Sequence, residues 1–492
     1  MFFLNLLWLS LSMAAVFWLQ PTAISAEALT GTWSGVATHA GETSPVIVEF
    51  TRSPDGETRA ALSLPAIHAR LGLGDVRIAG DRVDAGPLPF DFDASGQALV
   101  ARLPKGLIPK YDVQVRLRRS PTPAPVPTPR DLDAPVRQPL WTVDLNAPIW
   151  ADLAISDGLL IVGDDDGKLR GLEPATGRTR WTFAAEGALR ARPTFAGPDL
   201  IIQADGGWLY RLETATGKER WRTRIASKPA RRVPLDDPAS RYEYRASAAA
   251  IAGDVVFVGT HEGNLIAVGA KSANRIWTFK TGDSIVASPV VHDGRVYCGS
   301  MDHHLYVIDE RTGALTWKHD TGEAMTSTVA VLGSTILAGS RSYDLEALNA
   351  ADGRSVWKKY FWFSWVESSP SILGRTAYVG SSDAARVFAI DGGSGRSIWE
   401  SDVLGSAWAQ PIVTESMVYQ AVAGVTHYIA PHRGAIVALD RRSGRPQWWY
   451  PADEPRVSAT ASAAYGFVGA VAVDGDRIFA GGVNGRVHAF AR

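Results

Sequence analysis

Charged and aromatic side chains alternate in four segments that we expect to form the inner strands of a ring. Guanidinium groups bind carboxylates through two parallel hydrogen bonds, and aromatic rings stack on flat molecules, so such a set suits an anionic ring compound. The segments contribute Trp150 and Asp152, Arg190 and Arg192, Trp365 and Glu367, and Trp408 and Gln410. Aligning the strands by the glycine that follows places these side chains at one axis. Two interpretations are open there: a ligand site, or a solvated channel in which Asp152 and Arg192 pair.

The other residues suited to chemistry are isolated. The acidic run Asp164–Asp166 lacks the twelve-residue spacing and terminal Glu of an EF-hand, and the adjacent His303 and His304 have no partners at metal-ligand spacing. No G-x-S-x-G nucleophile motif is present. Cys298 is the single cysteine, which excludes an intramolecular disulfide, and we expect its side chain to be buried. The sequence therefore predicts no catalytic residue and no metal site.

Charge and composition exclude one large class of partner. The 492 residues include 50 Lys and Arg against 51 Asp and Glu, for a formal net charge of −1. Because no basic block or nucleic-acid-binding signature is present, we expect no binding to nucleic acid.

The first 28 residues have the pattern of a secretory signal. An apolar run to about Leu19 is followed by Pro21 and small residues, which predicts cleavage after Ala26 or Ala28. The alternative is an uncleaved anchor, since about 18 apolar residues nearly span a bilayer. The favoured interpretation is a periplasmic or secreted protein without a transmembrane span once residues 1–28 are removed.

Two domains and a linker are expected after the signal. Residues 29–119 contain short alternating runs separated by turns, which predicts a small all-β domain. Its opening, GTWSG at residues 31–35, resembles the G-x-W-x-G start of lipocalin-like β-barrels. Residues 120–139 carry prolines at 121, 123, 125, 127 and 129, a composition typical of an extended linker. Residues 140–492 form the second domain.

Eight tryptophans recur through the second domain at intervals of 40, 40, 56, 40, 40, 42 and 49 residues. A period near 40 residues, with three turns between four strand-like runs, predicts a four-stranded blade repeated around a ring. We expect each indole to pack against the adjoining blade. These docking residues are Trp141, Trp181, Trp221, Trp277, Trp317, Trp357, Trp399 and Trp448.

The ends of the repeat array predict how the ring closes. The last repeat stops before its tryptophan, whereas Trp141 follows the linker with no blade before it. If Trp141 completes the last blade, strands from both ends join one sheet. The predicted fold is all-β: an eight-bladed β-propeller preceded by a small β-barrel-like domain.

The phrase D-x-x-T-G-x-x-x-W, intact at Asp309, Thr312, Gly313 and Trp317, resembles the docking motif of propellers like those that bind pyrroloquinoline quinone (PQQ). In the third repeat Ser272-Ala273 replaces Thr-Gly, which predicts a different turn there. The resemblance implies one of two functional branches. One branch contains dehydrogenases that oxidise alcohols or sugars with PQQ and calcium, and the other contains BamB-like propellers that bind proteins of the outer-membrane assembly machinery.

Three features favour the non-catalytic branch. A single cysteine rules out the adjacent-cysteine disulfide that many quinoprotein alcohol dehydrogenases stack on the quinone, most blades are near minimal length, and no Glu, Asn and Asp set forms an evident calcium site. We therefore expect a binding or assembly scaffold with envelope protein partners and no cofactor. The alternatives are a PQQ-dependent oxidoreductase, with PQQ and calcium at the axis, and a ligand sensor without turnover. The insertions at 228–245 and 424–434 are either recognition loops or packing segments.

Overall fold

The structure is a computed structural model that describes residues 25–39, 42–86, 88–93, 96–102, 112–125, 131–234, 237, 240–426, 430–453 and 463–492. Most of the expected signal, residues 1–24, lies outside these ranges. The chain divides into two compact units, one formed by residues up to 124 without 64–70, and one formed by 64–70 and 125–492. Among the described residues, no helix combines the length and the apolar character needed to cross a membrane.

The first unit is built on a closed barrel in which β8 pairs with β1. Trp33, from the GTWSG segment, is buried in the barrel and donates a hydrogen bond from Nε1 to the Leu29 carbonyl at 2.8 Å. Its ring meets Phe92 edge-on, with centroids 5.6 Å apart. The elements of this part of the chain are α1 (Ala26–Leu29), β1 (Gly31–His39), β2 (Glu42–Arg52), β3 (Thr58–Leu64), the 3-10 helix η1 (Pro65–Ile67), β4 (Ala69–Ala79), β5 (Arg82–Ala85), β6 (Leu88–Phe92), β7 (Ala98–Arg102) and β8 (Gln114–Ser120).

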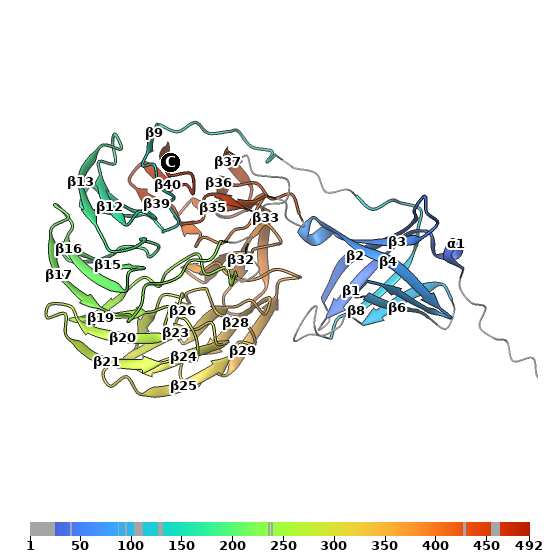
Figure 1. Ribbon diagram of the computed structural model, residues 1–492, viewed down its shortest axis with the longest axis horizontal. Coiled ribbons are helices and arrows are strands. Elements are labelled where there is room, and N and C mark those ends of the chain that lie inside the picture. Colours follow the sequence, from blue (N-terminus) through green and yellow to red (C-terminus); the bar gives the residue numbers. More distant parts are fainter. Residues whose placement is uncertain are drawn as a thin grey trace, which may run out of the picture. The chain divides into compact units, whose positions relative to one another are not determined.

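The second unit is a ring of eight antiparallel blades (Figure 1). Blades one to four are β10 (Ala154–Ser156), β11 (Leu159–Gly163), β12 (Lys168–Leu172), β13 (Thr179–Ala184); β14 (Thr194–Ala196), β15 (Asp199–Ala204), β16 (Trp208–Glu213), β17 (Glu219–Arg224); β18 (Ala250–Ala252), β19 (Val255–Gly259), β20 (Asn264–Gly269), β21 (Arg275–Lys280); and β22 (Val290–His292), β23 (Arg295–Gly299), β24 (His304–Asp309), β25 (Leu315–Asp320). Blades five and six are β26 (Ala330–Leu332), β27 (Thr335–Gly339), β28 (Asp344–Asn349), β29 (Ser355–Tyr360); and β30 (Ser371–Leu373), β31 (Thr376–Gly380), β32 (Arg386–Asp391), β33 (Ser397–Asp402).

The last two blades differ from the others in how they are completed. Blade seven comprises β34 (Ile412–Val413), β35 (Met417–Val425), β36 (Ala435–Asp440) and β37 (Pro446–Pro451), with β38 (Ala464–Gly466) added to β35; blade eight comprises β39 (Ala472–Asp474), β40 (Arg477–Gly481), β41 (Arg486–Ala491) and β9 (Trp141–Asp144). In blade eight, Trp141 pairs with Ala489 and Asp144 with Arg486. The two ends of the repeat array therefore close the ring in one sheet, and the predicted eight-bladed fold is confirmed.

Seven of the eight docking tryptophans, all except Trp448, lie against the hairpin between the third and fourth strands of the following blade. The Trp277 indole, for example, donates to the Glu310 carbonyl at 3.0 Å and covers Gly313. A Cβ at position 313 would lie 2.7 Å from the indole, and φ there is +72°, so the glycine is needed both for its conformation and for its lack of a side chain. The indoles of Trp141, Trp181, Trp221, Trp357 and Trp399 make the same kind of hydrogen bond. Trp317 covers Gly353, and Trp448 packs near Tyr419 and Phe490.

The third repeat keeps the common turn, so the prediction of a different turn was wrong. Ala273 donates its backbone N–H to the Gly269 carbonyl at 2.9 Å, as Gly313 does to Asp309 at 3.0 Å. Ala273 adopts φ +60° to do so, a conformation that an alanine adopts only with strain. The indole of Trp221, which donates to the Ala270 carbonyl at 2.9 Å, still docks there.

Candidate functional site

The candidate side chains lie at two levels of the inner strands. Four of them occupy the same position in their blades, four residues before the first paired residue of the inner strand. They are Trp150, Arg190, Glu367 and Trp408. Asp152, Arg192 and Gln410 lie two residues further along. Blade six is therefore shifted relative to the glycine alignment, which matched Glu367 with Asp152.

The axis is occupied by Tyr244, which comes from the insertion between β17 and β18. Its ring is buried and stacks on Trp408, with centroids 4.9 Å apart, and it lies 6.4 Å from Trp150. The phenol donates a hydrogen bond to Glu367 Oε2 at 3.3 Å. Burial, and next the charge of Glu367, raise the pKa of Tyr244 well above its usual value, so the phenol stays protonated. Three of the expected site residues thus surround one side chain of the protein itself.

Arg341 fixes the neighbouring part of the same insertion. Its Nε and Nη2 lie 2.7 and 2.6 Å from Glu367 Oε1, and its Nη1 donates to the Arg241 carbonyl at 2.8 Å. The guanidinium lies 4.7 Å from the centre of the Trp365 ring, which Tyr242 meets edge-on at 5.7 Å. Trp365 therefore contacts the insertion one level away from Trp150 and Trp408.

Two further arginines hold the backbone around Tyr244, and Nη1 of Arg190 donates to the Tyr244 carbonyl at 3.4 Å. Arg190 forms a bidentate ion pair with Asp165 at 2.8 and 2.6 Å and lies over the Trp150 ring at 4.9 Å. Arg245 donates from Nη2 to the carbonyls of Trp408 at 2.6 Å and Val468 at 3.2 Å. Residues 241–245 of the insertion are thus held at the axis.

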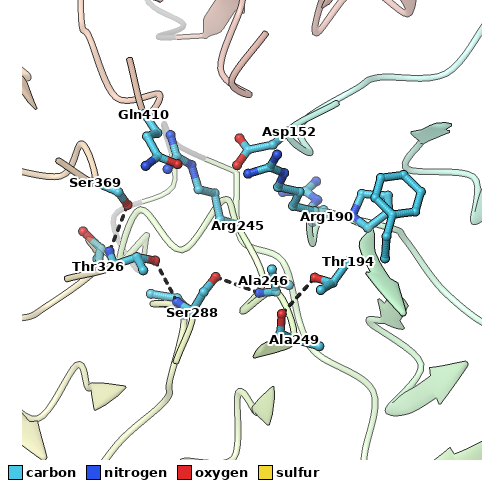
Figure 2. A pocket seen from close by; sticks show the side chains of 16 residues that line it. Asp152, Arg190, Thr194, Arg245, Ala246, Ala249, Ser288, Thr326, Ser369 and Gln410 are labelled. Carbon is cyan, nitrogen blue, oxygen red and sulfur yellow. Dashed lines mark hydrogen bonds between the residues drawn. The ribbon is translucent and has the colours of Figure 1, made fainter. Parts of the chain in front are cut away.

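Asp152, Arg192 and Gln410 instead line a cavity of about 330 Å³ beside this segment. Figure 2 shows Asp152, Gln410, Arg190 and Arg245 directed toward the centre of the pocket. No ion pair joins Asp152 to Arg192 among the described residues. Asp152 Oδ1 accepts a hydrogen bond from the Ala470 N–H at 2.7 Å.

Hydroxyl groups from consecutive blades form one wall of the cavity. The side-chain oxygens of Ser288, Thr328 and Ser369 accept hydrogen bonds from the backbone N–H groups of Ala248, Ser288 and Thr328 at 2.9, 3.0 and 2.9 Å (Figure 2). We call Ser288, Thr328 and Ser369 the hydroxyl girdle. It joins blades three to six around the axis and gives the cavity a polar wall.

The axial residues do not fit PQQ with calcium. Tyr244 lies beside the indoles of Trp150 and Trp408, where a quinone would stack. Among the residues that line the cavity, Phe195 is the one aromatic residue. Within the described ranges, no group of three or more His, Cys, Asp or Glu side chains is placed to hold a metal ion. Cys298 is buried and unpaired.

Sequence reasoning missed Tyr244, Arg245 and Arg341 as axial residues. The signal available for the first two was the long 56-residue interval between Trp221 and Trp277. Arg341 has no comparable signal, because it lies in an ordinary turn between β27 and β28.

The fold and the axis define this chain as an eight-bladed propeller of the PQQ-like class. A family model described as "Outer membrane protein assembly factor BamB" matches residues 130–241, 232–331 and 301–492, and the chain belongs to that family.

Solved structures with the same fold include both functional branches. BamB from Moraxella catarrhalis is 20% identical, with a TM-score of 0.54 over 73% of this chain and 98% of that chain. The quinohemoprotein alcohol dehydrogenase from Comamonas testosteroni is 14% identical, with a TM-score of 0.54 over 72% and 76%. The computationally designed Ika8 protein is 16% identical, with a TM-score of 0.55 over 71% and 98%. A search of the curated proteins finds no match.

Proposed function

We propose that the protein is a protein-binding or assembly scaffold of the cell envelope, exported and without a cofactor. The observation that carries this proposal is the occupied axis: Tyr244 lies beside the indoles on which a quinone would stack, in a chain of the BamB family. A quinone-dependent oxidoreductase is the less favoured function, because Tyr244 would first have to leave Trp150 and Trp408.

The outer strands supply a surface suited to protein partners. Large apolar side chains recur on the fourth strand of consecutive blades three to six, where a soluble protein normally places polar residues. They are Ile276, Leu315, Val356 and Ile398, which are 51, 47, 56 and 54% exposed. Ile276, Val356 and Ile398 each directly precede a docking tryptophan. The repeat therefore places these three side chains at the same position on the outer strands of their blades. Apolar groups displayed in this way contribute to protein–protein contacts.

Site-specific photo-crosslinking in the cells that express the protein tests this proposal. A photo-reactive residue in place of Val356 is expected to capture an envelope protein, while the same residue in place of Arg311, in the exposed hairpin before β25, is not. With the photo-reactive residue at position 398, we expect Val356→Asp to reduce the amount of partner that is captured, compared with the same protein carrying Val356. Equal crosslinking at positions 356 and 311, or recovery of the protein from the cytosol, would contradict the proposal.

A further inference from the structure

We propose that the axial cavity binds a small molecule through an oxyanion group, a carboxylate or a phosphate. This inference does not depend on the protein-binding proposal, because the cavity is lined by inner-strand residues and the proposed partner surface is on the outer strands. Its volume of about 330 Å³ suits a compact metabolite-sized anion.

The charges around the cavity favour an anion. Arg190, Arg192 and Arg245 line it together with a single carboxylate, Asp152. Arg190 is already paired with Asp165. Arg192 is exposed and makes no hydrogen bond or ion pair within the described part of the chain. Two guanidinium groups therefore remain against one carboxylate, and a guanidinium can bind an oxyanion through two hydrogen bonds.

Arg245 remains a cation despite its position in the interior. Burial acts to lower its pKa, whereas the carboxylates Asp152 and Glu367 act to raise it, and a guanidinium stays protonated in proteins. The cavity is thus lined by one permanent positive charge from Arg245 and by a second from the exposed Arg192.

Unpartnered donors lie at the same place. Arg245 Nε and Thr326 Oγ1 are buried and have no hydrogen-bond partner among the described residues, and both residues line the cavity. A buried donor without a partner costs about 1–3 kcal/mol. Arginine N–H groups only donate, so Arg245 Nε requires an acceptor and not a metal cation. Because Nε is shielded from the cavity space in this conformation, the guanidinium must turn to reach a bound oxyanion.

The hydroxyl girdle adds donors of the same kind. Each of Ser288, Thr328 and Ser369 already accepts a hydrogen bond from a backbone N–H, so its own O–H is left to donate. Guanidinium groups on one side and O–H donors on the other are complementary to a ligand that carries several acceptor oxygens.

Calorimetric titration of the full chain with citrate and with inorganic phosphate, at constant ionic strength, tests the proposal. We expect saturable 1:1 binding of at least one of them. Preference for citrate would assign a carboxylate ligand, and preference for phosphate a phosphate group.

Two variants are expected to change the affinity in opposite directions. Arg192→Gln removes an attractive charge and should weaken binding about tenfold. Asp152→Asn removes the repulsive charge, keeps an oxygen for the Ala470 N–H, and should tighten binding several-fold. Arg396→Gln, in the exposed hairpin of blade six, is the matched control and should leave the affinity unchanged.

Thermal unfolding without ligand establishes that each variant is folded. Absence of saturable binding of both anions at millimolar concentrations would overturn the proposal. It would also be overturned if Arg192→Gln and Asp152→Asn changed the affinity in the same direction, or if Arg396→Gln weakened binding as much as Arg192→Gln.

Discussion

The phenol ring of Tyr244 stacks on the indole of Trp408, with centroids 4.9 Å apart and an interplanar angle of 26°. The two residues are 164 positions apart in the sequence and come from different parts of the ring. Their contact connects the insertion before blade three with blade seven across the axis. Tyr244 therefore ties together blades that share no sheet.

Removing the Tyr244 ring should destabilise the propeller. Tyr244→Ala leaves a cavity between Trp150 and Trp408 and is expected to lower the free energy of unfolding by about 3–4 kcal/mol. Tyr244→Phe keeps the ring and loses only the hydrogen bond to Glu367, so we expect a loss of about 1 kcal/mol. Urea unfolding followed by tryptophan fluorescence measures both. If Tyr244→Ala cost no more than Tyr244→Phe, the axial stack would not contribute to stability.

The hairpin residues of repeats three and four should respond oppositely to substitution. Ala273→Gly relieves the strained φ of +60° and is expected to raise the free energy of unfolding by about 1 kcal/mol. Gly313→Ala places a Cβ 2.7 Å from the Trp277 indole at φ +72° and should lower it by at least that amount. Denaturant midpoints of the two variants give the comparison. A stabilising Gly313→Ala would show that the two turns are not equivalent.

The closing blade should make stability depend on pH through His488. This residue pairs with Thr142 across the β41–β9 junction, and burial first, then Arg486, lowers its pKa from 6.5 to about 4. The unfolded chain then binds the proton more readily than the folded chain between these values. The stability that depends on neutral His488 is therefore fully present above pH 6.5 and is lost as the pH falls toward 4. This loss lowers the free energy of unfolding by at most about 3 kcal/mol.

His488→Gln should flatten this part of the profile. The change keeps a polar side chain opposite Thr142 but removes the titrating group. Free energies of unfolding at a series of pH values between 4 and 7 measure the slope. His303→Gln, at a half-exposed turn, is the control and should leave the slope unchanged. An unaltered slope in His488→Gln would refute the role given to this residue.

The blades and their closure were predictable because the repeat specifies short-range pairing within each blade and contact with the next. Trp141 lacked a blade of its own, and the only sheet missing a strand was the last. Repeat three was predicted less well, since neighbouring strands and the Trp221 indole hold Ala273 in a turn that its own preference opposes.

The axial site was predictable only in part. Period and alignment placed Trp150 and Trp408 near the axis, but the glycine alignment shifted blade six by two residues. Tyr244 lies in an insertion with no repeat, and its position depends on Arg190, Arg245 and Arg341, which are distant in the sequence or carry no pattern. Such contacts are set by the assembled ring and not by local preference.

Mixing the purified full chain with PQQ and calcium, followed by gel filtration with absorbance detection, tests the central claim most directly. If Tyr244 holds the axial position beside Trp150 and Trp408, no 1:1 complex with PQQ should survive the column, and no alcohol or sugar should reduce a dye in its presence. Co-elution of stoichiometric PQQ with dye-reducing activity would contradict the claim that the protein itself fills this position.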